Sequence, residues 1–163
     1  WLPKELILFN NCNLKRKINF NLSKDSNLLL CENIIFGRTS MKETFEKGYF
    51  SDFWNINIDK KLIHTEAINT GLFEKKYLNS FSTLNNNSSA ATIIIVGEKF
   101  LNKVNNLAET LTNNENTTSN YSHWDNKLIV RLLSKDSYNL KFAIDKILSY
   151  FFEGSKIPKV WNI

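Results

Sequence analysis

The amino-acid sequence predicts a predominantly β, α+β fold, in which an antiparallel strand meander precedes a strand-helix-strand-helix segment. Residues 1–68 alternate apolar and polar side chains with period two, which is typical of half-buried strands. Beyond Gly71 two stretches change to the helical period. Hydrophobic residues make up 42% of the chain, enough for a packed core. We therefore expect a single domain over 1–163, with a β meander at 1–70 and a β/α segment containing two helices at 71–163.

Several short strands account for the first half. Residues 17–22 and 54–58 both place isoleucine and other apolar side chains on one face, with lysine or asparagine on the other. Residues 28–36 form a longer apolar run that predicts a more deeply buried strand. The Asn10-Asn11 pair and the segment Ser23-Lys-Asp-Ser26 supply turns between these runs.

The second half starts with a short helical or irregular link at 72–77 and a polar loop at 84–89. Residues 91–96 are mostly β-branched, which predicts a buried strand. Residues 98–111 then follow the helical period. Their apolar face consists of Phe100, Val104, Leu107 and Leu111.

The rest of the chain predicts a loop, a strand and a second helix. Residues 112–120 are polar and low in complexity, so we expect a mobile surface loop. A strand follows at 126–133. Asp136 is a favourable N-cap for a final helix, and Gly154 suits the position just after its end.

Charge and cysteine content exclude several functional classes. The net charge is +5, but it comes from scattered lysines, and the three arginines are far apart, which argues against nucleic-acid binding. The longest uncharged apolar run, at 90–97, is too short to cross a membrane. Cys12 and Cys31 have no second cysteine or histidine near them, so they predict reduced thiols in a cytoplasmic protein.

Catalytic chemistry finds little support in the sequence. The two histidines are His64 and His123, and Asp125 lies close enough to His123 to make a small hydrolytic domain an alternative interpretation. A structural or surface role is the simpler reading of both histidines. A basic RNA-associated module is a third hypothesis. Motifs for hydrolases, metalloproteases and nucleotide binding do not occur in the sequence.

Three carboxylates interrupt apolar surroundings: Glu5, Glu32 and Glu43. A buried carboxylate must be paired, hydrated or bound to a cation, because isolated burial of its charge is too costly. The simpler expectation for Glu32 is an ion pair with Arg38 or a nearby lysine. The alternative is that these oxygens line an internal passage along which a divalent ion moves.

Three segments in a fixed order carry a family resemblance. Residues 1–9 read W-L-P-K-E-L-I-L-F, residues 32–43 read E-N-I-I-F-G-R-T-S-M-K-E, and residues 157–161 read I-P-K-V-W. They resemble the UreD/UreH family of urease accessory proteins, whose patterns are W-L-P-x-E-x-I-x-F, E-x-x-x-F-G-R-x-x-M-x-E and L-P-R-V-W. The residues that match the family pattern are Trp1, Leu2, Pro3, Glu5, Glu32, Gly37, Arg38, Met41, Glu43, Trp54, Trp124, Asp125, Pro158, Val160 and Trp161.

This chain departs from the family pattern at a few positions. Lys42 replaces a usual glycine, Lys159 a usual arginine, and Asn10-Asn11 a usual Asp-Gly pair. Because the chain begins at Trp1 and opens directly into a strand, we expect it to be the C-terminal portion of a longer protein.

The resemblance implies a non-enzymatic role in urease maturation. Family members are elongated β-rich scaffolds that assemble on the urease apoprotein with accessory proteins of the UreF and UreG families, the latter a GTPase. It further implies that nickel passes to the urease active site along an internal path, so Ni²⁺ would be in transit rather than a tightly bound cofactor. Glu5, Glu32 and Glu43 are the candidate residues for that path. No nucleic acid or membrane is expected among the partners.

Overall fold

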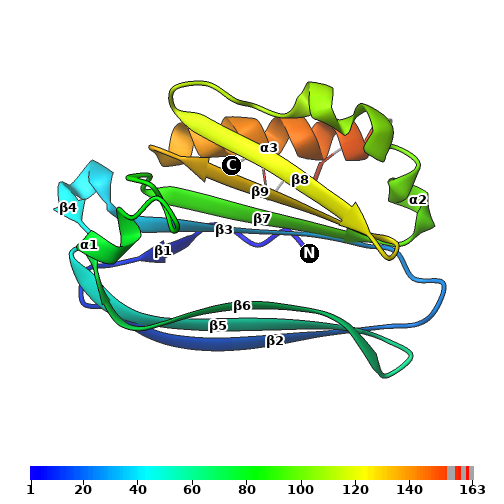
Figure 1. The fold of residues 1–163 in the computed structure, drawn as a ribbon, viewed down its shortest axis with the longest axis horizontal. Helices are drawn as coiled ribbons and strands as arrows, with labels where there is room; N and C mark the ends of the chain where they lie inside the picture. The colour runs from blue at the N-terminus through cyan, green and yellow to red at the C-terminus, as the bar shows by residue number, and fades with distance from the viewer. Residues whose placement is uncertain (154–156, 159–160, 162–163) are drawn as a thin grey trace.

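The computed structural model describes residues 1–153, 157, 158 and 161. Two β-sheets lie face to face, and one long helix covers the outer face of the larger sheet (Figure 1). The strands are β1 (Leu6–Leu8), β2 (Asn13–Leu22), β3 (Leu28–Arg38), β4 (Glu43–Thr44), β5 (Lys47–Ile58), β6 (Lys61–Glu74), β7 (Ser89–Val96), β8 (Thr117–Trp124) and β9 (Lys127–Ser134). The helices are α1 (Lys75–Leu78), α2 (Glu98–Leu101) and α3 (Ser137–Phe151), with 3₁₀ turns η1 (Thr39–Met41) and η2 (Val104–Thr110).

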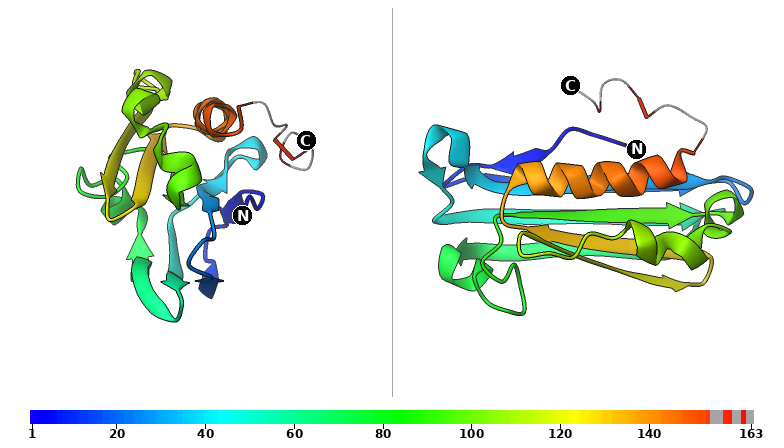
Figure 2. Two further views of the ribbon diagram at one scale, coloured as in Figure 1. Left: turned by 90° about the vertical axis from the view of Figure 1, so that its right-hand side faces the viewer. Right: turned by 90° about the horizontal axis from the view of Figure 1, so that it is seen from above.

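The larger sheet, called sheet A here, has the strand order β1-β3-β7-β9-β8, with β4 paired to β3. Sheet B has the order β2-β5-β6. The two sheets and α3 form three layers, which are clearest end-on in Figure 2. The predominantly β, α+β fold class is confirmed.

The predicted antiparallel meander is wrong in its connectivity. β1 pairs with β3 in parallel, and β2 pairs with β5 in parallel. β3 is apolar on both faces and lies inside sheet A, whereas β2 alternates exposed and half-buried residues and forms an edge of sheet B. Sheet A therefore combines strands from both parts of the chain, with β1 and β3 from 1–70 beside β7, β9 and β8 from 71–163.

Two predictions for the second half also need correction. The helix expected at 98–111 is a four-residue α2 followed by the 3₁₀ turn η2, although Val104 and Leu107 still face the core. Asparagines at 102, 105 and 106 favour turns over a continuous helix. The loop expected at 112–120 contains the first residues of β8, whose hydroxyl-bearing Thr117 and Ser119 are buried.

Other expectations are confirmed. Residues 91–96 lie in β7, and the strand expected at 126–133 is β9, which begins one residue later. The link expected at 72–77 is only partly helical, because residues 72–74 end β6 and α1 begins at Lys75. Asp136 caps α3 by accepting a hydrogen bond from the Asn139 N–H at 2.8 Å. Gly154, Lys159 and Val160 lie outside the described residues.

Backbone geometry constrains three turn positions. Gly37 has φ +87°, and a Cβ at this position would lie 2.8 Å from the Phe45 nitrogen. Lys42 and Asn11, two of the expected departures from the family pattern, have a left-handed backbone, with φ of 59° and 60°. Both turns therefore form without glycine.

Trp161 belongs to the core between sheet A and α3. It is 2% exposed and belongs to the core cluster that residues of β3, β7, β9 and α3 form. Its indole Nε1–H donates to Asp145 Oδ1 at 2.8 Å. Trp161, a family-motif residue, is thus part of the packed core.

Among the described residues, no helix has the length and apolar character needed to span a membrane.

Candidate functional site

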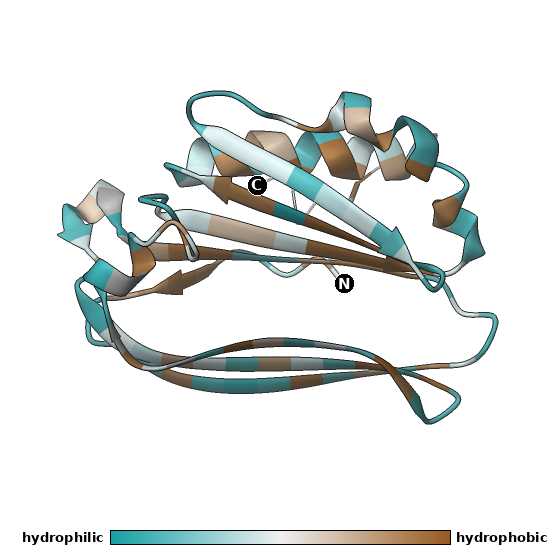
Figure 3. Cartoon of the chain, viewed as in Figure 1, coloured by the Kyte–Doolittle hydropathy of each residue, from teal (hydrophilic) through white to brown (hydrophobic). Residues whose placement is uncertain are grey.

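Strands of both sheets share an unusual feature: a charged residue stands in the middle of the row of side chains that faces the other sheet. On β2 this residue is Arg16, on β3 it is Glu32, and on β5 it is Asp52. Apolar residues flank each one two positions away, as Leu30 and Ile34 flank Glu32. The alternation of teal and brown along sheet B reflects the same period (Figure 3).

Strand register brings the polar residues of sheet A into one line across the strands. Glu32 pairs with Thr92, Thr92 with Arg131, and Arg131 with Asn120. Hydrogen bonds and ion pairs connect this line to charged residues of sheet B. We call the whole set the polar belt: Glu32, Thr92, Arg131 and Asn120 of sheet A with Arg16, Asp52, His64 and Glu66 of sheet B.

The polar belt divides the space between the sheets into two apolar clusters. One contains Leu30, Trp54 and Ile94, and the other contains Ile34 and Phe50. Large hydrophobic residues could have filled this position and joined the clusters. Charges in the middle of a sandwich core stabilise it less well than such residues, so the belt points to a function.

Arg16 lies at the centre of the first half of the belt. Its Nη2 lies 2.8 Å from Glu32 Oε2 and 2.6 Å from Asp52 Oδ2, while its Nε donates to Asp52 Oδ1 at 2.9 Å. The side chains of Glu32 and Asp52 are 2% and 0% exposed. Trp1 closes this end by donating its indole N–H to Glu32 Oε1 at 2.7 Å. One guanidinium therefore pairs with two buried carboxylates from different sheets.

Burial acts to lower the pKa of Arg16, but the hydrogen bonds that it donates to Asp52 and Glu32 outweigh this effect and raise that pKa above the ordinary value. The guanidinium is therefore charged throughout the physiological range. It holds the position between two carboxylates that a metal cation would otherwise favour.

Arg131 forms the second half of the belt. It makes a bidentate pair with Glu66, with Nη1–Oε1 at 3.0 Å and Nη2–Oε2 at 2.7 Å, and donates to Thr92 Oγ1 at 3.2 Å. His64 Nε2 lies 3.5 Å from Glu66 Oε2. Burial acts to raise the pKa of Glu66, but His64 and Arg131 outweigh it and hold that pKa below the ordinary value of 4.5.

Among the described residues, the buried indole Nε1 of Trp54, beside the belt, has no hydrogen-bond partner. The buried imidazole Nε2 of His64, within the belt, has only the long 3.5 Å contact to Glu66 Oε2. Leaving such a group unsatisfied is costly, and native structures keep few of them. The middle of the belt thus contains polar capacity that the protein's own side chains do not use. Within the described part of the chain, no three His, Cys, Asp or Glu side chains are grouped closely enough to hold a metal ion.

The predicted pair between Glu32 and Arg38 is wrong. The two residues are six positions apart in one extended strand, a separation of roughly 20 Å. Arg38 instead pairs with Glu43 of β4, and its guanidinium lies over the ring of Phe9, 4.2 Å from the centroid. The Arg38 contact and the Asn10 N–H lower the pKa of Glu43. This cluster fixes the turn that joins β3 to β4.

The structure does not bring the three predicted path carboxylates together. Glu32 lies in the polar belt, and Glu43 lies in the β3–β4 turn. Glu5 is exposed and lines a pocket on the α3 side of sheet A with Asn33 and Lys141. Of the three, Glu32 alone faces the space between the sheets.

The remaining motif residues have varied environments. Trp54 is buried beside the belt, with the Arg16 guanidinium 6.0 Å from its ring centroid. Trp124 is 42% exposed, under Lys127. Pro3 is half-buried and Pro158 exposed.

The residues of the alternative hydrolytic site lie at the surface. His123 is exposed near the end of β8. Asp125 has φ 44° in the following turn, and its carboxylate is 81% exposed and 3.8 Å from Lys127 Nζ. Neither side chain faces a buried cleft.

Sequence reasoning missed most of the belt: Arg16, Asp52, His64, Glu66, Thr92, Asn120 and Arg131. The sequence contained a signal for some of them. Arg16 and Asp52 each occupy a position on the apolar face of a strand, so they interrupt the period-two pattern in the same way as Glu32. The pairing between distant strands carried no local signal.

Comparisons with known proteins agree with the motifs. The family model described as "UreD urease accessory protein" matches residues 1–162. The "Urease accessory protein UreD" of Rhizobium leguminosarum bv. viciae is 34% identical over 166 residues, covering 100% of this chain and 59% of the relative. The "Urease accessory protein UreD" of Agrobacterium fabrum is 29% identical over 166 residues, which cover 100% of this chain and 56% of the relative.

A shorter match is that of Granulibacter bethesdensis, which is 41% identical over 95 residues, covering 58% of this chain and 40% of the relative. The chain spans just under three fifths of the length of the first relatives. The match over almost all of its residues shows that this chain belongs to the UreD family of urease accessory proteins.

Proposed function

We propose that this protein is a non-enzymatic scaffold that helps to deliver nickel to the active site of urease. In this proposal it acts in the cytoplasm, on the urease apoprotein, together with accessory proteins of the UreF and UreG families. Family membership supports the role in urease maturation. The polar belt is the observation that carries the nickel-transfer part.

The belt offers the ligand types that suit a divalent nickel ion in passage. Imidazole nitrogen and carboxylate oxygen both coordinate Ni²⁺, and the belt supplies His64 and Glu66 from β6 and Glu32 and Asp52 from β3 and β5. They come in pairs, and a pair holds an ion less tightly than a full set of protein ligands. Weak successive contacts suit a cargo that must leave.

Charge balance gives the transfer a physical basis. Arg16 now serves as the shared counterion of Glu32 and Asp52, and Arg131 is the counterion of Glu66. An arriving Ni²⁺ would replace a guanidinium between the carboxylates, so that the buried charges never lack a counterion. The side chains of Arg16 and Arg131 are 24% and 56% exposed, so both can swing outward at the two ends of the belt.

Reconstitution tests this function. Urease apoprotein is incubated with nickel, GTP and the UreF- and UreG-family proteins, with or without this protein. We expect urease activity and bound nickel, measured by mass spectrometry of the metal, to rise only when this protein is present, and the four proteins to co-elute. Equal nickel loading without it would contradict the proposal.

A further inference from the structure

Strand β8 forms one edge of sheet A, and half of its outer side is already covered. The residue pairing places the backbone groups of Thr117, Ser119, Tyr121 and His123 away from β9. The preceding loop meets the first two of these. Asn114 N–H donates to the Thr117 carbonyl at 2.9 Å, and Asn113 Oδ1 accepts from the Ser119 N–H at 2.7 Å.

The second half of this edge is open. The Tyr121 N–H reaches only the side chain of its neighbour Asn120, at 2.8 Å. Among the described residues no strand pairs with β8 on this side. Natural sheets guard such edges with lysine, proline or bulges, yet the open residues 121–124 include neither lysine nor proline. This part of the edge therefore lacks these guards.

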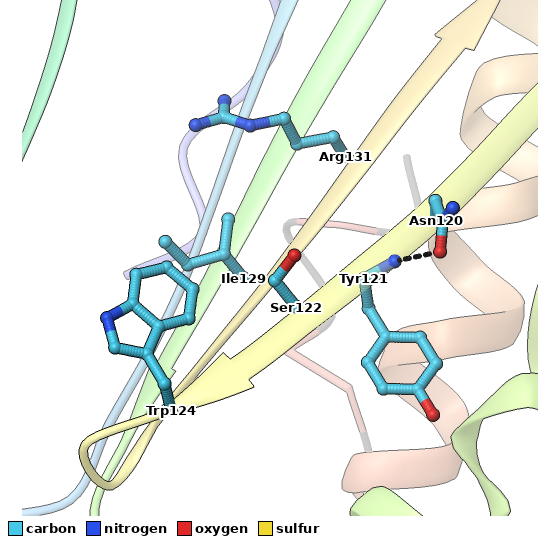
Figure 4. Close-up of a pocket in the computed structure, with 6 residues that line it drawn as sticks. All are labelled: Asn120, Tyr121, Ser122, Trp124, Ile129 and Arg131. Carbon is cyan, nitrogen blue, oxygen red and sulfur yellow. Dashed lines mark hydrogen bonds between the residues drawn. The ribbon is translucent and has the colours of Figure 1, made fainter.

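A pocket of about 220 Å³ lies against this same half of β8 (Figure 4). Trp124 and Ile129 lie side by side at one end, and Ser122 stands between them and Asn120. Tyr121 points the other way, toward the α3 side of the sheet. Arg131 extends along the opposite wall, with a side chain that is 56% exposed. The pocket thus combines an apolar end with a polar wall, formed by the Arg131 side chain that pairs with Glu66.

We propose that this flank binds an extended segment of a partner protein, which adds to sheet A as a strand beside Tyr121–Trp124. Backbone groups of the segment pair with those of Tyr121 and His123, the mode known as β-augmentation. One apolar side chain of the segment enters the pocket against Trp124 and Ile129. An acidic side chain two residues away lies against the exposed face of Arg131.

A peptide segment fits this edge better than a second copy of the chain. The open part is four residues long, bounded by the covered half of β8 on one side and by the Asp125–Asn126 turn on the other. Two copies could pair only over this length, because each carries the same obstructions. A flexible segment is not restricted in these two ways. It can also place an acidic side chain beside the exposed part of Arg131, next to the carboxylate of Glu66 that already pairs with the guanidinium. This inference does not depend on nickel transfer.

Labelled ten-residue peptides test the proposal by fluorescence anisotropy. They alternate threonine and valine, vary one central position among Phe, Leu and Ala, and vary the position two residues on among Asp, Asn and Lys. We expect Phe or Leu with Asp to bind most tightly. His123→Pro, which removes an outward N–H without touching the β9 ladder, should weaken that binding about tenfold or more.

His123→Thr is the matched control, since it keeps the N–H at the same exposed position, and it should bind as the unchanged protein does. Ser122→Phe should fill the pocket and remove the preference for Phe over Ala. Equal affinities for His123→Pro and His123→Thr, or absence of binding by every peptide, would overturn the proposal. So would a doubling of mass in sedimentation that His123→Pro abolishes, because the edge would then serve self-association.

Discussion

Replacing Arg16 with methionine should lower the free energy of unfolding by about 3–5 kcal/mol, measured by urea denaturation at neutral pH. Methionine fills much of the same space but leaves Glu32 and Asp52 as two buried carboxylates without a counterion. Their mutual repulsion adds to the cost of burying each charge. Divalent nickel should restore much of the loss, because the emptied position then favours a cation.

Two further variants control this result. Lys17→Met changes a neighbouring exposed position of β2 and should alter stability by no more than about 0.5 kcal/mol. Adding Glu32→Gln and Asp52→Asn to Arg16→Met removes the buried charges and should recover most of the stability. An Arg16→Met protein as stable as the unchanged one would show that the pairing is not important to the fold.

Trp161→Ala should cost about 3–5 kcal/mol of folding stability, also by denaturant unfolding. The indole fills space between α3 and sheet A, and its N–H is the partner of Asp145 Oδ1. Lys141 stacks on the ring, 4.7 Å from its centroid, and pairs with Asp145 at 2.6 Å, so the change also loosens this polar corner.

Trp124→Ala provides the comparison, because Trp124 is also a family-motif tryptophan but is 42% exposed. It should cost about 1 kcal/mol or less. If Trp161→Ala kept its stability and instead lost a partner protein in pull-down experiments, the core assignment of Trp161 would be wrong.

Local patterns carried most of the fold class. Period two in β2 and β5 and the capped helix α3 follow from neighbouring residues, so the sequence predicted them. The sheet order did not follow. The parallel pairing of β2 with β5 joins residues more than thirty positions apart, which periodicity does not encode. β8 was missed because its buried hydroxyls are satisfied across the fold, as Thr117 Oγ1 is by Ser134 Oγ at 3.0 Å.

Of the polar belt, the sequence predicted Glu32 as a site residue but not the ion pairs and hydrogen bonds that connect it to other strands. Glu32 is conspicuous because it interrupts an apolar strand. Its partner Arg16 lies sixteen residues earlier, in a strand that appears simply amphipathic. Recognising the pair requires the knowledge that β2 and β3 lie in opposing sheets. Tertiary packing, rather than any local preference, creates the belt.

The most direct test of nickel transfer through the belt compares Glu32→Gln with Glu43→Gln in reconstituted urease. Glu32→Gln keeps the shape of the side chain and leaves Arg16 paired with Asp52, so folding and partner assembly should persist. Nickel bound per urease should fall about tenfold or more with Glu32→Gln, since a ligand in the path is lost. It should stay unchanged with Glu43→Gln, which lies outside the belt. Full nickel loading with Glu32→Gln, or loss of stability together with loss of assembly, would contradict a path through the polar belt.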